Sequence, residues 1–152
     1  MNKVSKKQID SFFESRRFAI AGVSRDPKKF GRQVFTDLRK KGFDIVPVNP
    51  AVSEIDGETC YKSVDEIPGD IDSLLILTPK AQTDIILRQA IRKGIKNIWV
   101  QQMSDTEDTL RIAEEYQQEI ISGKCIYMFA EPVQSVHKFH RSLMKIFRRL
   151  PK

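Results

Sequence analysis

Residues 22–31 include the residue types that bind phosphate groups. They read Gly-Val-Ser-Arg-Asp-Pro-Lys-Lys-Phe-Gly, and they join an apolar run to a helical pattern. A glycine lets the backbone approach an anion closely, and the first turn of a helix presents unpaired amides to negative charge. We therefore predict that a diphosphate binds this loop, through Gly22, Val23, Ser24, Arg25, Lys28, Lys29 and Gly31. The alternative is that the fold needs a glycine at this turn and tolerates surface lysines.

Two better-known phosphate-binding motifs are absent. The loop lacks the G-x-G-x-x-G pattern of dinucleotide-binding domains, and the chain has no G-K-S/T sequence of a P-loop. An NAD-binding domain also places Asp or Glu after its second strand, where the carboxylate holds the ribose hydroxyls. Here that position reads Val48-Asn49-Pro50. This apolar, rigid edge is suited to an adenine face rather than to a ribose diol.

The loop is embedded in alternating strand and helix patterns. We expect a leading helix within residues 1–16, with Ile9, Phe12 and Phe13 as its docking face. Near-continuous apolar strands separated by amphipathic helices are typical of an α/β fold with a doubly wound, mostly parallel sheet, Rossmann-like, with helices on both faces. Ligands of such sheets bind beyond the carboxyl ends of the strands. The predicted strands are 18–22, 43–48, 74–78, 97–101 and 125–129, and the later helices are 33–41, 80–93, 106–121 and 134–150.

Length and composition favour one cytoplasmic domain covering residues 1–152. No apolar run approaches the ~18 residues of a membrane span, and no apolar block follows the N-terminal lysines as in a secretory signal. Two cysteines without an export signal indicate reduced thiols. The net charge of +6 comes from residues 137–152, which contain six Lys or Arg and no acidic residue. Nucleic-acid binding usually needs a broader basic surface, so it is not expected.

Several sequence blocks resemble a known family. Residues 18–24 (FAIAGVS) with RDPKKFG after them, 42–50 (GFDIVPVNP), 55–61 (IDGETCY) and 94–101 (GIKNIWVQ) resemble small stand-alone coenzyme A-binding proteins. These are related to the nucleotide-binding domain of the succinyl-CoA synthetase alpha subunit. The resemblance covers about residues 17–130, and it implies a Rossmann-like domain that binds CoA or an acyl-CoA.

The resemblance also implies where each part of CoA would lie. Gly22, Ser24 and Arg25 would hold the phosphates, while Lys28 and Lys29 are our own electrostatic addition. Adenosine would contact Val48, Asn49 and Pro50, with Tyr61 and Ser63 flanking the nucleotide. Thr78 and Pro79 would contact the pantetheine arm.

Two departures from the family affect the thiol end of CoA. Small members often have a cysteine just after the last strand, whereas the stretch interpreted as corresponding, residues 128–132 with Glu131, has no thiol. The usual glycine after residues 99–101 is replaced by Gln102-Met103-Ser104. Either the ligand differs at that end, or only the nucleotide half of the site is retained.

No catalytic apparatus stands out. Cys60 and Cys125 are interpreted mainly as buried structural residues, and Glu131 as a charge at a helix entry. His137 and His140 are only two ligands, so no metal site is predicted.

Three functions therefore stay open. The leading one is a non-catalytic CoA carrier, sensor or subunit. The second is an enzyme acting on an acyl-CoA or a nucleotide, and the third is a nucleic-acid or membrane-surface module that uses residues 137–152. A homodimer is an open possibility, because small members of such families often dimerise.

Overall fold

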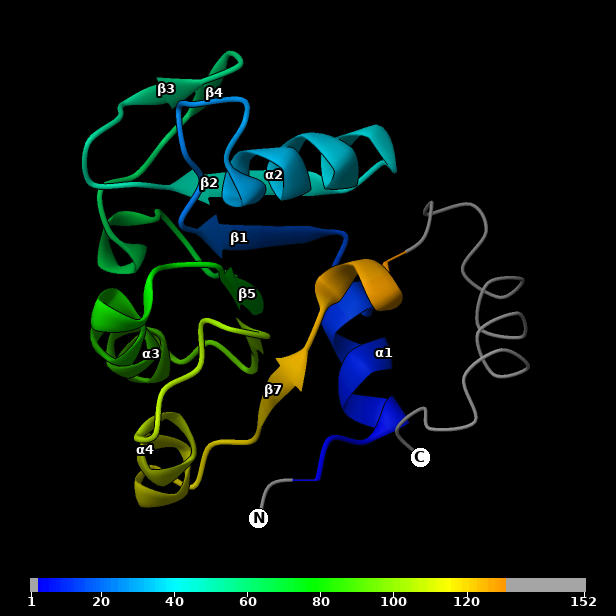
Figure 1. The fold of residues 1–152 in the computed structure, drawn as a ribbon, viewed down its shortest axis with the longest axis vertical. Coiled ribbons are helices and arrows are strands. Elements are labelled where there is room, and N and C mark those ends of the chain that lie inside the picture. Colours follow the sequence, from blue (N-terminus) through cyan, green and yellow to red (C-terminus); the bar gives the residue numbers. More distant parts are fainter. Residues whose placement is uncertain (1–2, 131–152) are drawn as a thin grey trace.

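The computed structural model describes residues 3–130, which form a five-stranded parallel sheet with helices on both faces (Figure 1). This confirms the predicted doubly wound α/β fold. The predicted C-terminal helix 134–150, together with Glu131, His137 and His140, lies outside the described residues. The strands of the main sheet are β1 (Arg17–Ala21), β2 (Asp44–Val48), β5 (Ser73–Ile76), β6 (Asn97–Gln101) and β7 (Ile120–Lys124), and the helices are α1 (Lys6–Glu14), α2 (Phe30–Lys40), α3 (Lys80–Lys93) and α4 (Thr109–Glu115).

The strand order places a topological switch between β1 and β5. The order across the sheet is β2-β1-β5-β6-β7, so the chain moves outward from β1 in one direction to β2 and in the other from β5 to β7. Because every neighbouring pair is parallel, all carboxyl ends meet at one edge of the sheet. The loops after β1 and β5 diverge there and leave room for a ligand.

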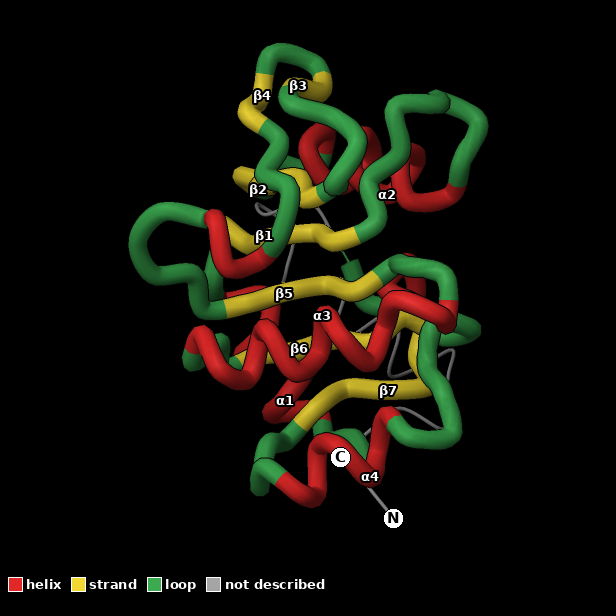
Figure 2. The backbone as a smooth tube through the Cα atoms, turned by 90° about the vertical axis from the view of Figure 1, so that its left-hand side faces the viewer, coloured by secondary structure: helices red, strands yellow, loops and turns green. Residues whose placement is uncertain are grey.

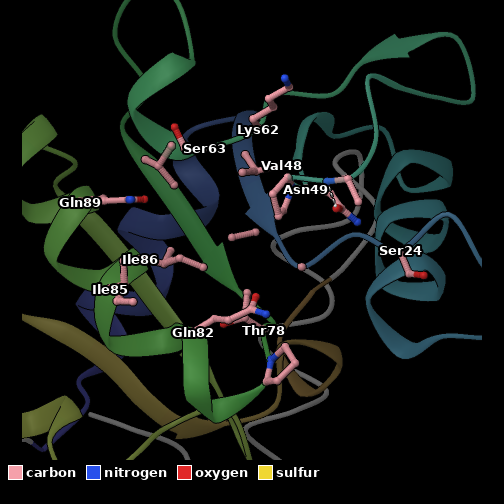
Figure 3. A pocket seen from close by; sticks show the side chains of 16 residues that line it. Ser24, Val48, Asn49, Lys62, Ser63, Thr78, Gln82, Ile85, Ile86 and Gln89 are labelled. Carbon is pink, nitrogen blue, oxygen red and sulfur yellow. Dashed lines mark hydrogen bonds between the residues drawn. The ribbon is translucent and has the colours of Figure 1, made fainter.

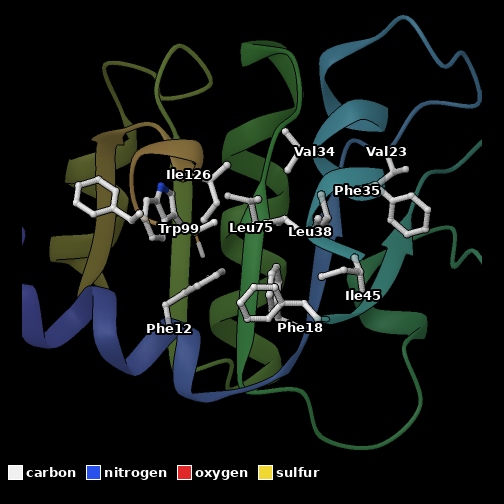
Figure 4. Close-up of a cluster of buried hydrophobic side chains, with 14 of the residues drawn as sticks. Phe12, Phe18, Val23, Val34, Phe35, Leu38, Ile45, Leu75, Trp99 and Ile126 are labelled. Atoms are coloured by element: carbon white, nitrogen blue, oxygen red, sulfur yellow. The ribbon is translucent and has the colours of Figure 1, made fainter. Parts of the chain in front are cut away.

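Alternation along the strands divides the core into two layers. In β1, Phe18 and Ile20 face α1 and α2, whereas the small Ala19 and Ala21 face the other side of the sheet. That side is covered by α3 and α4 (Figure 2). Figure 4 shows the first layer, where Phe18, Phe12 of α1 and Trp99 of β6 pack together. The ring centroid of Phe12 lies 5.0 Å from that of Phe18 and 5.3 Å from that of Trp99.

Helix α1 has a complete N-terminal capping box. The Ser5 hydroxyl accepts a hydrogen bond from the Gln8 amide, and the Gln8 side chain accepts one from the Ser5 amide. Such reciprocal caps satisfy amides that would otherwise lack partners. The helix buries Ile9 and Phe12 and packs Phe13 partly against the same core, as the sequence predicts.

A small hairpin and a short helical turn follow β2. Strands β3 (Glu54–Ile55) and β4 (Glu58–Thr59) form the antiparallel hairpin, and a single 3-10 turn, η1 (Val64–Glu66), follows it. Between the hairpin and η1, Tyr61 forms a parallel bridge to Val48, on the edge of β2 that β1 does not occupy. These segments build one side of the sheet's carboxyl edge.

The prediction for the last strand was wrong by about five residues. The strand is β7, residues 120–124, while the predicted strand 125–129 contains the 3-10 turn η2 (Ile126–Met128). The predicted helix 106–121 shrinks to α4, which begins at Thr109 and ends before Gln117, whose positive φ of 54° lies outside the α-helical region. As a result, Cys125 directly follows the last described strand.

The other helices differ less from prediction. Helix α3 has the predicted bounds, and Gly94 ends it in the left-handed conformation at φ 85°. Helix α2 begins at Phe30, three residues earlier than predicted. Among residues 3–130, none of the helices combines the length and hydrophobicity that a membrane span requires.

Candidate functional site

A cleft of about 510 Å³ opens where β1, β2 and β5 end (Figure 3). Its floor is formed by Ala21 and Gly22, one wall by the ends of β2 and η1, and the other by α3. The cleft lies at the switch point, where ligands of such sheets bind. Eight of the predicted site residues line it: Gly22, Ser24, Val48, Asn49, Pro50, Ser63, Thr78 and Pro79.

The other six predicted site residues lie outside the lining. The side chain of Val23 is fully buried in the core on the α1 and α2 side. The side chains of Arg25, Lys28 and Lys29 are exposed on the loop before α2. Gly31 is buried in the first turn of α2, and Tyr61 packs partly against the core on the α3 side.

Gly22 and Gly31 allow α2 to pack directly on the end of β1. Gly22 has a φ of +100°, and a Cβ atom there would lie 2.8 Å from the backbone carbon of Leu77. A Cβ atom on Gly31 would collide with the carbonyl oxygen of Gly22. The two glycines thus do what a Rossmann motif requires of its glycines, a tight turn and close helix packing, although their spacing differs.

The loop between these glycines is held by its own polar groups. The Ser24 hydroxyl accepts a hydrogen bond from the Asp26 amide (3.0 Å), and the Asp26 carboxylate accepts one from the Lys28 amide (2.9 Å). The N-cap residue of α2, Lys29, makes no side-chain capping hydrogen bond. The first turn of α2 therefore presents uncapped amides beside Gly22, as an anion site requires.

Arg32 ties this loop to the β3–β4 hairpin. Its guanidinium donates to the Arg25 carbonyl (2.9 Å) and forms an ion pair with Asp56 (2.7 Å). The Arg32 side chain is only 14% exposed, so solvent screens this pair less than it would a surface pair. Arg32 is a positioning residue for the loop, and its charge is already paired.

Asn49 fastens the end of β2 to the end of β1. Its amide nitrogen donates to the Val23 carbonyl (2.7 Å), and its amide oxygen accepts from the Ala51 amide (2.8 Å). Both ends of the Asn49 amide are therefore used within the protein, although one N–H remains. Asn49 shapes the cleft wall and leaves Val48 and Pro50 to present apolar surface.

The other hydroxyl groups of the cleft lining differ in whether the protein already uses them for hydrogen bonds. The buried Thr78 hydroxyl contacts that of Thr83 (3.0 Å), and the Thr83 hydroxyl donates to the Pro79 carbonyl (3.4 Å), so this pair secures the entry of α3. Ser63 is the N-cap of η1, but its side chain makes no capping hydrogen bond. The Ser63 hydroxyl can therefore serve a ligand.

The cysteine near the cleft is turned away from it. Cys60 is buried in the core on the α2 side, and its thiol lies 3.9 Å from the Asn49 carbonyl oxygen. Burial raises the pKa of the Cys60 thiol, an effect only partly opposed by that hydrogen bond. A thiol with a raised pKa is a poor nucleophile, so Cys60 is a structural residue, as the sequence favoured.

The family becomes clear from comparison with known proteins. A family model described as a CoA binding domain matches residues 16–131. The chain belongs to this CoA-binding domain family.

Relatives of this CoA-binding domain are both long and short. The alpha subunit of an ADP-forming acetate–CoA ligase from Pyrococcus furiosus is 33% identical over an alignment of 129 residues, and the match covers 78% of this chain and 28% of that subunit. An uncharacterised Bacillus subtilis protein is 27% identical and is matched over 94% of its length and 83% of this chain. The solved structure of a conserved hypothetical protein from Pyrococcus furiosus superposes with a TM-score of 0.70 at 36% identity, covering 73% of this chain and 96% of that one. The chain thus spans about a quarter of the ligase subunit but most of the two short proteins.

The structure corrects one apparent departure from the family. The sequence interpretation placed Cys125 inside a strand and found no thiol after the last strand. Cys125 instead follows β7 directly and is half-buried at the N-cap of η2. The segment after the last described strand therefore contains a thiol, contrary to the sequence interpretation.

Sequence reasoning missed the wall that α3 contributes. The residues that this helix buries are Thr83, Leu87 and Ala90, so Ile85 and Ile86 lie away from the buried face. Ile85 is 62% exposed and lines the cleft together with the partly buried Ile86. Thr83, Leu87 and Ala90 are separated by four and then three residues, which is the spacing of one helix face, and this pattern could have identified the buried face. Further lining residues that were missed are Ala51, Lys62, Val64, Gln82 and Gln89.

The lining determines what chemistry the cleft can support. It contains amides, hydroxyls, apolar side chains and one lysine, Lys62, and the described residues that line it include no Asp, Glu, His or Cys. Within residues 3–130, no cluster of three or more His, Cys, Asp or Glu side chains could hold a metal ion. The cleft therefore offers a ligand hydrogen-bonding groups, apolar surface and one positive charge.

Proposed function

We propose that this domain binds coenzyme A or an acyl-CoA in the cleft at the switch point. The observation that carries the proposal is the juxtaposition at Gly22: an apolar cleft without carboxylates opens beside the uncapped first turn of α2. An adenine ring needs apolar walls, whereas a diphosphate needs backbone amides and positive charge. Both requirements are met within one continuous surface, in a chain whose family model is a CoA binding domain.

In this proposal, each wall takes one part of the ligand. The adenine lies between Val48 and Pro50 on one side and Ile85 and Ile86 on the other. The diphosphate lies at Gly22 and Ser24, with Arg25, Lys28 and Lys29 supplying charge from the exposed loop. The pantetheine arm leaves past Thr78 and Pro79 along the carboxyl edge of the sheet. Tyr61 flanks the nucleotide indirectly, through its bridge to Val48.

We further propose that the domain itself is a non-catalytic carrier, sensor or subunit. The described lining holds one lysine and no acidic residue. It therefore provides no pair of ionisable side chains that could act as acid and base. General acid–base catalysis needs a proton donor or acceptor within hydrogen-bond reach of the reacting atoms. A homodimer and a cytoplasmic location stay predictions of the sequence.

Calorimetric titration with CoA tests the binding proposal. We expect saturable heat with the full chain, and a much weaker signal for Ser63→Trp, whose indole would fill the cleft. Ser53→Trp adds the same ring at an exposed position outside the lining and should bind as the parent does. Absence of heat and of a thermal shift at millimolar CoA would overturn the proposal.

A screen for thioester hydrolysis and acyl transfer separates carrier from enzyme. We expect no product from acyl-CoA thioesters, with or without nucleotide. Turnover that survives Cys60→Ser and falls with Ser24→Ala or Arg25→Ala would instead identify an enzyme. A salt-sensitive interaction with RNA or anionic vesicles that is lost without residues 137–152 would identify the third alternative.

A further inference from the structure

One charged side chain stands among the residues of the cleft. Of the described residues that line it, Lys62 alone is charged at neutral pH. Figure 3 shows Lys62 at the rim, with Asn49 between it and Ser24. Lys62 therefore lies on the adenosine side of the cleft, away from the loop that would hold the diphosphate.

The backbone at Lys62 is firmly held. Its neighbour Tyr61 donates to the Pro47 carbonyl (3.1 Å) and accepts from the Asn49 amide (2.9 Å), so this segment is fixed to the end of β2. The Lys62 amide donates to the Glu66 carboxylate (3.3 Å). The Glu66 carboxylate, which is not part of the cleft lining, thus accepts a hydrogen bond from the Lys62 backbone. This bond fixes the point from which the Lys62 side chain extends.

The ammonium of Lys62 is available to a ligand. Its side chain is exposed, and none of the ion pairs among residues 3–130 includes it. Arg32, by contrast, is already paired with Asp56. A lysine ammonium without a partner, next to an adenosine wall without a carboxylate, favours a ligand with negative charge on its ribose.

We infer that Lys62 binds the 3′-phosphate of coenzyme A and makes the cleft selective for 3′-phosphorylated adenosine. This inference rests on the proposed function. With adenine against Val48 and Pro50, the ribose lies at the same rim as Lys62. A free ribose diol is usually held by an acidic residue after the second strand, and this chain has Val48-Asn49-Pro50 there instead. The cleft thus has no carboxylate to bind a ribose diol, whereas the Lys62 ammonium can bind a phosphate on the ribose.

The test compares two ligands that differ only in the 3′-phosphate. CoA and dephospho-CoA are titrated calorimetrically into the parent chain, Lys62→Gln and Lys96→Gln. Lys96 is an exposed lysine at the opposite, amino-terminal edge of the sheet, and its substitution makes the same change in net charge. Both substitutions are at exposed positions, so folding should be unaffected, and a thermal melt of each variant checks this.

We expect the parent and Lys96→Gln to prefer CoA by about fivefold, the size of a solvent-exposed ion pair. Lys62→Gln should bind the two ligands equally, through weaker CoA binding and unchanged dephospho-CoA binding. The preference of the parent should shrink as salt is added. Equal binding of both ligands by the parent, or an unchanged preference in Lys62→Gln, would overturn the role of Lys62. Failure of both ligands to bind the parent would overturn the proposed function itself.

Discussion

The carboxyl edge of the sheet is open at one end and closed at the other. At β1, β2 and β5, strand ends separate around a cleft, and the Ser63 hydroxyl and the uncapped first turn of α2 are left for a ligand. At β6 and β7, side chains of β6 form hydrogen bonds with the end of β7 and with the segment that follows it. The buried Gln101 side chain accepts from the Ile126 amide (3.0 Å), and the Trp99 indole donates to the Lys124 carbonyl (3.0 Å).

The difference follows from topology. Consecutive crossovers from β5 to β7 run in the same direction, so each loop can cover the strand end beside it. Between β1 and β5 the direction reverses, so within residues 3–130 the loops after these two strands lead to opposite sides of the gap. Mutations at the closed end should therefore change folding stability, while those at the open end should change binding.

The largest effect is expected at the junction of the two glycines. Gly31→Ala places a methyl group against the Gly22 carbonyl, so α2 must move away from β1. We expect a loss of roughly 3 kcal/mol in the free energy of unfolding, as for other overpacked cores, together with loss of CoA binding. Urea unfolding measures the first and calorimetry the second.

Gly69→Ala is the matched control for Gly31→Ala. Gly69 has a φ of 74°, and a Cβ atom there would meet nothing within 4 Å. It should cost only about 1 kcal/mol, the strain of a left-handed alanine, and leave CoA binding intact. Equal losses of stability from the two substitutions would contradict the close packing of α2.

The second prediction concerns the closed end. Gln101→Leu removes the acceptor of the Ile126 amide and leaves that buried donor unpaired. We expect a loss of about 2 kcal/mol in unfolding free energy, within the usual range for such a group. CoA affinity should stay unchanged because Gln101 lies outside the cleft. Gln102→Leu, at an exposed neighbour, should change neither quantity, and weaker CoA binding by Gln101→Leu would show that the two ends are coupled.

The third prediction concerns the open end. Ile85→Ser removes apolar surface from the α3 wall at a position that is 62% exposed. The unfolding free energy should change by less than about 0.5 kcal/mol, as for most surface positions. CoA affinity should fall by about fivefold, since roughly 1 kcal/mol of apolar contact with the adenine is lost. Leu87→Ser, on the buried face of the same helix, should cause a large loss of unfolding free energy while the folded protein keeps its CoA affinity. Unchanged CoA affinity in Ile85→Ser would place the adenine elsewhere.

The sequence predicted the central elements better than the last ones. Helix α3 and strand β6 were placed with correct bounds because Gly94 marks the helix end and residues 98–100 are all buried. At the C-terminal edge, Gln117 ends α4 without a glycine, and β7 reads Ile-Ile-Ser-Gly-Lys, with only its first two residues buried. An edge strand of this kind looks less like a strand than the more apolar segment after it.

The candidate site divides in the same way. Residues directly after β1, β2 and β5 could be predicted because topology alone brings the ends of parallel strands together. The positions of Ile85 and Lys62 could not, since they depend on how α3 is rotated and on the bridge between Tyr61 and Val48. Neither feature has a local pattern in the sequence.

The smallest expected effect is at Met103, in the loop after β6. Met103 has a φ of 77° and is 76% exposed, so it occupies a glycine-like conformation without packing gains. A left-handed conformation costs a non-glycine residue about 1–2 kcal/mol, and glycine removes this strain. Glycine also increases the entropy of the unfolded chain, which lowers stability by about 0.5–1 kcal/mol and so offsets part of the gain. Met103→Gly should therefore raise the unfolding free energy by about 0.5 kcal/mol without changing CoA affinity. If Met103→Gly were instead to strengthen CoA binding, the closed end would also take part in ligand binding, because a smaller residue there would have given the pantetheine arm more room.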